Sequence, residues 1–228
     1  WNAIMHCVDQ FSADCAQASS PREFSAVQAM QALDAASSAL AAITGAQTDR
    51  MARDDGWQLL SIGRHVERLG FLASALDLAV DVGAFDHPDD GAHAGDENNS
   101  HFSALLALFD STITFQAQYP QSRDLAPLIE LLVLDNDNPR SLAWVARTLR
   151  GRLSKLADTP MGEPDALARL VPDLKNTDWV ELCMRDGEGK LTHLRACLSV
   201  CMQAAWQVSD AITARYFSHT DHADSVGA

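Results

Sequence analysis

The stretch from Arg53 to about Val82 constrains the fold most, because it carries an unbroken helical pattern of apolar residues. Asp54 and Asp55 lie at its start, where carboxylates accept free N–H groups and favour the positive end of the helix dipole. The apolar positions that follow are Leu59, Ile62, Val66, Leu69, Ala73, Leu76 and Val80. They recur at steps of three and four residues, which predicts a long central helix.

The opposite side of this helix is not uniformly polar. At about 100° per residue, it carries the apolar side chains Trp57, Leu60, Phe71 and Leu78. The charged residues Arg64, Glu67 and Arg68 lie among them. Only a narrow strip is typical of a solvated face, and it consists of Gln58, Ser61 and His65. We therefore expect the helix to pack on two sides, with three charges inside its second contact face.

Helical spacing continues along most of the chain, and no stretch alternates as a strand does. The expected helices span residues 1–18, 21–45, 102–119, 125–134, 139–156, 165–170, 178–184 and 191–216. The helix at 21–45 has Ser20 as N-cap and Gly45 as C-cap, and the helix that ends at Leu156 has Asn138 as N-cap and Pro139 at N1. The helices at 165–170 and 178–184 are short. Residues 83–100 are acidic and glycine-rich, which predicts a mobile loop, and 218–228 are expected to be a disordered tail. The fold class is all-α: an antiparallel bundle of long helices with several short helices, as a single domain over residues 1–217.

Composition excludes several classes of partner. The net charge of −14 argues against nucleic acid and anionic membranes, which both attract basic surfaces. Five cysteines without regular spacing favour a reducing cytoplasm over a disulfide framework, and no apolar run has the length of a membrane span. The chain starts at Trp1 within a helical pattern and without a Met, so we expect it to be part of a longer polypeptide.

Metal and nucleophile motifs are absent from the sequence. There is no Glu-x-x-His pair for a di-iron bundle, no phosphate-binding loop and no Gly-x-Ser-x-Gly. Cys197 and Cys201 are interpreted as small core residues. His87, His93 and His101 lie in or beside the acidic loop, where incidental solvated histidines are a better interpretation than rigid metal ligands. We expect no metal and no cofactor in this chain.

Two stretches are candidates for a binding site. Arg64, Glu67 and Arg68 share one helix face through their i, i+3, i+4 spacing. They are either a salt-bridge set that ties helices together, or an anion or carboxylate site in which Glu67 holds one arginine and the other forks onto a ligand. Trp57 is either a pocket wall beside them or a core residue.

The second stretch is residues 135–141. Capping accounts for Asn138 and Pro139, whereas Arg140 and Ser141 are expected in the first turn of a helix, where free N–H groups bind anions. The same helix is the one basic element of the sequence, with Arg147 among its cations. If Arg64 and Arg68 face Arg140 and Ser141, the two stretches form one site.

These stretches also carry a family resemblance. Residues 51–57, Met-Ala-Arg-Asp-Asp-Gly-Trp, followed by Gly63-Arg64-His65-Val66-Glu67-Arg68, resemble the signature of the bacterial alpha-E domain family. Leu131–Leu134, Asp135 and Asn138-Pro139-Arg140-Ser141 are similar to its second signature, and residues 110–115 and 212–217 resemble further family segments in the same order. The resemblance covers residues 1–217. An earlier helix with a second Gly-Arg and Glu-Arg motif is absent here, so we expect the charged face of the central helix to be more exposed than in the whole protein.

The resemblance implies a cellular context. Such domains occur fused to or beside circularly permuted ATP-grasp proteins, and near transglutaminase-like proteins, which implies amide or peptide bond formation. The leading hypothesis is an accessory helical domain that binds a partner or a carboxylate or peptide substrate, with ATP and Mg²⁺ belonging to the ATP-grasp partner. The candidate binding residues are Arg53, Asp54, Trp57, Arg64, Glu67, Arg68, Arg140, Ser141 and Arg147. The alternatives are an enzyme acting on amides with Glu67 as general acid or base, and a purely structural role.

Overall fold

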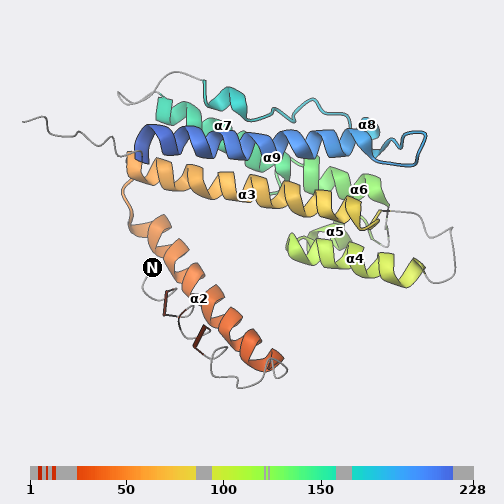
Figure 1. Ribbon diagram of the computed structural model, residues 1–228, viewed down its shortest axis with the longest axis horizontal. Coiled ribbons are helices and arrows are strands. Elements are labelled where there is room, and N and C mark those ends of the chain that lie inside the picture. The colour runs from red at the N-terminus through yellow and green to blue at the C-terminus, as the bar shows by residue number, and fades with distance from the viewer. Residues whose placement is uncertain are drawn as a thin grey trace, which may run out of the picture. The chain divides into compact units, whose positions relative to one another are not determined.

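The computed structural model describes residues 5, 6, 9, 12, 13, 25–85, 94–120, 122, 124–157 and 166–217. Within these ranges the chain forms helices and turns, with no strand, which confirms the all-α fold class (Figure 1). The chain divides into two units, Trp1–Trp57 and Gln58–Ala228, and each is described by itself. The single domain over residues 1–217 therefore stays a prediction.

The main element of the first unit is helix α2, Ala26–Arg50. Ser25 caps it by accepting the N–H of Gln28 at 3.4 Å. The predicted end at Gly45 was wrong, because the helix continues through it; one internal glycine costs a helix only about 1 kcal/mol. The predicted start at Ser20 and most of the predicted first helix lie outside the described residues. The described residues within that first helix are 5, 6, 9, 12 and 13, and they are helical.

Helix α3, Asp55–Asp81, is the predicted central helix. Its buried residues are Ser61, Ile62, Val66, Leu69, Leu72, Ala73, Leu76 and Ala79. They include the expected seam from Ile62 to Leu76, whereas its two end members, Leu59 and Val80, are half-buried. The two remaining faces are the reverse of the prediction. Ser61 is buried and His65 half-buried, whereas Phe71 and Leu78 are 54% and 62% exposed, beside the exposed Arg64, Glu67 and Arg68.

The reversal has a local cause. His65 Nδ1 lies 2.6 Å from the carbonyl oxygen of Ser61, and the His65 ring stacks on Trp144 with centroids 5.9 Å apart. The His65 ring is thus partnered within the helix, which allows it to pack against a neighbouring helix, whereas Gln58 Oε1 in the same strip is buried without a hydrogen-bond partner among the described residues.

Helix α9, Thr192–Ile212, continues as the π-helical segment η4, Thr213–Phe217, and lies antiparallel beside α3 (Figure 1). Small residues allow the close approach, since a Cβ added at Gly70 would meet the Ala205 Cβ at 3.5 Å. Further along, Ser74 Oγ donates to Met202 Sδ at 3.3 Å. Cys201 is fully buried and Cys197 half-buried, as predicted for core residues.

The predicted helix 102–119 is instead two helices, α4 (Ala94–Leu108) and α5 (Thr112–Gln118). Asp110 separates them with a left-handed φ of 47°, and the Ser111 N–H donates back to Leu106 O at 2.8 Å. Ile113, expected to be buried, is consequently 84% exposed. Part of the predicted acidic loop is also helical, since α4 starts at Ala94; residues 86–93 lie outside the described part.

The remaining helices agree with the sequence pattern apart from their ends. They are α6 (Leu125–Ile129), its π-helical continuation η2 (Glu130–Leu134), α7 (Leu142–Ala157), the 3-10 turn η3 (Ala168–Leu170) and α8 (Trp179–Cys183). The predicted start of α7 at Pro139 was wrong, because the helix begins at Leu142. In the described residues, no helix combines the length and the apolar character needed to cross a membrane.

Candidate functional site

The turn between η2 and α7 is held by side chains that bond to the backbone. Asp135 Oδ1 accepts the N–H groups of Asp137 at 2.7 Å and Asn138 at 3.2 Å. Asn138 Oδ1 accepts the N–H of Arg140 at 3.0 Å, and Asn138 Nδ2 donates to Leu131 O at 3.0 Å. These bonds fix the backbone immediately before Arg140, so the direction of its side chain is set by the turn.

Ser141 caps α7. It is fully buried, its Oγ donates to Asp135 O, and the same Oγ accepts the N–H of Trp144 at 3.0 Å. Both hydrogen-bonding roles of the hydroxyl are therefore occupied by the protein. The sequence placed Ser141 in a binding site, and the structure places it beneath the surface as an N-cap.

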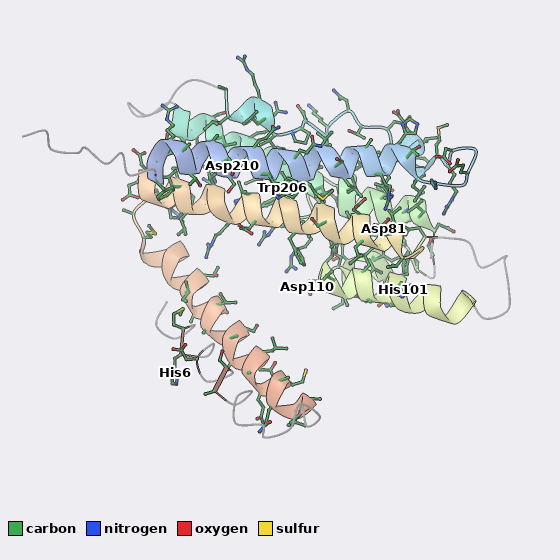
Figure 2. All side chains as sticks on the ribbon, viewed as in Figure 1. His6, Asp81, His101, Asp110, Trp206 and Asp210 are labelled. Carbon is green, nitrogen blue, oxygen red and sulfur yellow. The ribbon has the colours of Figure 1, made fainter. Side chains whose placement is uncertain are left out.

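Arg140 spans from this turn to the end of α4. Its Nη2 lies 2.6 Å from Asp110 Oδ2, and its Nη1 donates to Phe109 O at 3.5 Å. Figure 2 shows Asp110 at the break that follows α4. The side chain of Arg140 remains 42% exposed. Arg147, which is exposed, instead donates from Nη2 to Asn136 O at 2.7 Å and supports the turn.

Arg68 connects the two candidate stretches. It is exposed overall, yet enough protein surrounds its guanidinium for burial to lower the pKa, and the positive charges of Arg140 and Arg64 lower it further. Arg68 and Arg140, predicted to share a site, are thus close enough to repel. In the described part of the chain, no carboxylate lies within salt-bridge distance of Arg68, and Glu67 forms no hydrogen bond or ion pair. The predicted Glu67–arginine salt bridges are therefore not formed among these residues.

His65 belongs to the same region, although no role in a site was predicted for it. Burial lowers its pKa most, the hydrogen bond to the Ser61 carbonyl opposes this, and the charges of Arg68, Arg152 and Arg64 lower it further. We name Arg64, Arg68 and Arg140 the arginine cluster, with the His65–Trp144 stack beside it. The i, i+4 spacing of His65 from Ser61 was the feature of the sequence from which the contact between them could have been predicted. No feature of the sequence near Arg152 or Trp144 indicated that either residue lies close to His65.

Arg53, Asp54 and Trp57 form a local cluster at the start of α3, in the first unit. The Arg53 guanidinium lies 4.2 Å from the Trp57 ring centroid, and Asp54 Oδ1 accepts the Trp57 N–H at 2.9 Å. A Cβ at Gly56 would come within 3.3 Å of that same oxygen, which explains the glycine. Asp54 is thus the predicted N-cap, and the three residues form the helix start that their spacing indicated.

The described residues contain no group of three or more His, Cys, Asp or Glu side chains that could hold a metal ion. Guanidinium groups in proteins recognise anions such as carboxylates and phosphates.

Comparison with known proteins agrees with the sequence signatures. Residues 1–217 match the family described as Alpha-E, a predicted alpha-helical domain with a conserved ER motif. The chain has one Glu-Arg pair, Glu67–Arg68, on the exposed face of α3. Uncharacterized proteins of Mycobacterium bovis and of Mycobacterium tuberculosis strains are each 27% identical over 114 residues. The match covers 50% of this chain but 12% of those relatives, and no solved structure matches. The extent of the family match shows that the chain belongs to the Alpha-E family.

Proposed function

We propose that this chain is an accessory, anion-binding domain of an ATP-grasp ligase-type system, in which the arginine cluster holds a carboxylate of a peptide substrate or of the partner protein. The observation that carries the proposal is that the positive charges of Arg140 and Arg64 lower the pKa of Arg68, while no carboxylate of the described residues lies within salt-bridge distance of it.

Crowded cations favour an anionic ligand for an energetic reason. The guanidinium groups of Arg140 and Arg64 disfavour the charged form of Arg68, and partial burial of Arg68 removes some of the water that would screen its charge. A bound carboxylate relieves this repulsion and accepts two parallel N–H donors from one guanidinium. Arg140 is held in advance by Asp110 and by the Asp135–Ser141 turn, so little side-chain freedom is lost on binding.

The neighbourhood of the cluster suits a macromolecular ligand. Phe71 is exposed one helical turn from Arg68 on α3, which adds apolar area beside the cations. The chain is also strongly acidic overall, with a net charge of −14, so a local group of arginines is distinct from the rest of the surface.

The ligase setting rests on the family resemblance and on length. The mycobacterial relatives are far longer than the segment that matches, which covers 12% of each, so they have room for further domains. ATP and Mg²⁺ would be bound by the ATP-grasp partner, in cis or as a neighbour, and amide or peptide bond formation would take place there.

The test is binding of a triglutamate peptide to the full chain by calorimetry. Arg68→Glu and Arg140→Glu should each weaken binding about tenfold or more, since a charge-assisted hydrogen bond contributes about 1.5–3 kcal/mol. Arg169→Glu on η3, also exposed, is the charge-matched control and should leave the affinity unchanged.

The partner is tested separately, by co-purification of the chain with an ATP-grasp protein encoded beside it and mass spectrometry of any retained peptide. Equal triglutamate affinity in the parent and in both cluster variants would overturn the anion site. Retention of the ATP-grasp partner by Arg68→Glu at the parent level would separate partner binding from the cluster.

A further inference from the structure

A pocket lies on the second unit, at the C-terminal end of α3. It has a volume of about 280 Å³ and lies between the end of α3, the turn that follows it, and the loop that leads into α9. Its apolar lining is Val80, Phe85 and Leu191. Figure 2 shows Asp81, which lines it, at the C-terminal end of α3. We name it the Phe85 pocket.

The wall formed by residues 185–190 is rigid. Asp186 Oδ1 accepts the N–H groups of Glu188 and Lys190, both at 2.9 Å, and Gly189 takes a left-handed φ of 79° to close the turn. Arg185 then ties the turn to the end of α3, donating to Phe85 O at 2.5 Å and to Gly189 O at 2.7 Å. The pocket is therefore formed before any ligand binds.

Charges of both signs line this pocket. Arg185, Lys190 and Arg195 are cationic, whereas Asp81 and Glu188 are anionic. Lys190 Nζ lies 2.6 Å from Glu188 Oε2, and these side chains are 66% and 75% exposed. Arg195 pairs with Asp81 and Asp77. The Lys190–Glu188 pair is exposed and adds little to stability, so a ligand carrying both charges can exchange with it at small cost.

We propose that the Phe85 pocket binds a free amino acid with an apolar side chain. The carboxylate pairs with Lys190 and Arg185, the ammonium pairs with Asp81 or Glu188, and the side chain lies against Phe85 and Val80. A pocket of this volume is at the small end of ligand sites, which fits a single amino acid better than a nucleotide or a peptide. The mixed charge fits a zwitterion better than an anion, which Asp81 and Glu188 would repel. The proposal is independent of the arginine cluster.

Three probes separate the contributions of the two charges. L-phenylalanine carries both, 3-phenylpropionate lacks the ammonium, and phenethylamine lacks the carboxylate. Titrated into the full chain and followed by saturation-transfer NMR, L-phenylalanine should saturate with a Kd of about 1 mM or below, and each analogue should bind about tenfold more weakly. No saturable binding of L-phenylalanine, or equal binding of 3-phenylpropionate, would overturn the proposal.

Variants place the ligand. Lys190→Gln and Glu188→Gln change exposed side chains and should keep the fold, while each should weaken the binding of L-phenylalanine about tenfold. Lys175→Gln, also exposed, is the control and should bind as the parent does. Unchanged affinity in Lys190→Gln together with loss in Arg68→Glu would move the amino acid to the arginine cluster and refute this pocket. Equal triglutamate affinity in the parent, Arg68→Glu and Arg140→Glu would refute only the proposed function.

Discussion

Replacing Ser141 with alanine tests whether this residue is a helix cap or part of an anion site. In the structure the hydroxyl is fully buried and bonds to two backbone groups, Asp135 O and the N–H of Trp144. Ser141→Ala removes both bonds without adding volume, so it changes the cap and nothing else.

The magnitude follows from these two bonds. Loss of an N-cap side chain costs about 1 kcal/mol. The Asp135 carbonyl loses its partner in a partly buried position, which adds about 1 kcal/mol more. We therefore expect the free energy of unfolding to fall by about 2 kcal/mol, or the Tm by about 4–8 °C for a chain of this size.

Urea denaturation of the full chain, followed by circular dichroism at 222 nm, measures the effect. The midpoint should fall with an unchanged slope, since the denatured state is not altered. Ser209→Ala, at an exposed position of α9, is the matched control and should stay within about 0.5 kcal/mol of the parent. Equal stability of the two variants would refute the capping argument. Weaker triglutamate binding by Ser141→Ala at parent stability would return Ser141 to the binding site.

Three further predictions concern α3 and the turn before α5. The pKa of His65 is lower in the folded state, so the unfolded chain binds more protons below about pH 6.5, and the free energy of unfolding should fall as pH drops from there towards the folded pKa. His65→Gln should therefore make the urea midpoint depend less on pH between about 7.5 and 5.5. Parallel plots of midpoint against pH for the parent and His65→Gln would contradict this. Gly63→Ala should raise the free energy of unfolding by about 0.5–1 kcal/mol, because no atom lies within 4 Å of the added Cβ; a loss would indicate an unrecognised contact. Asp110→Ala should lower the free energy of unfolding, measured by calorimetry, by about 1–2 kcal/mol, because alanine tolerates a φ of 47° poorly and cannot form the ion pair with Arg140. Asp110→Asn should lower it by less than half as much.

The sequence was sufficient for the helices but not for all of their faces. The seam from Ile62 to Leu76 is apolar at every step, and only a helix buries such a pattern. The adjoining strip was misjudged because residue type alone does not show whether a polar atom is already partnered. His65 bonds to the carbonyl one turn earlier and stacks on Trp144, and the stacking partner comes from a different helix. A prediction from the periodicity of α3 alone could not include it.

The convergence of Arg68 with Arg140 was foreseen as a possibility, and its physical basis lies in features without periodicity. Arg140 is positioned by an Asx-type turn at Asp135 and by an ion pair to Asp110, the residue whose left-handed φ ends the predicted helix 102–119. The helix break that the sequence missed therefore also positions Arg140, one of the residues of the proposed anion site. If α4 continued straight through Asp110, this carboxylate would occupy a different position and would not hold Arg140 in its present place. Asp110 is therefore a positioning residue for the arginine cluster, so Asp110→Ala should weaken triglutamate binding through Arg140, and Arg140→Glu should add little further loss in the double variant.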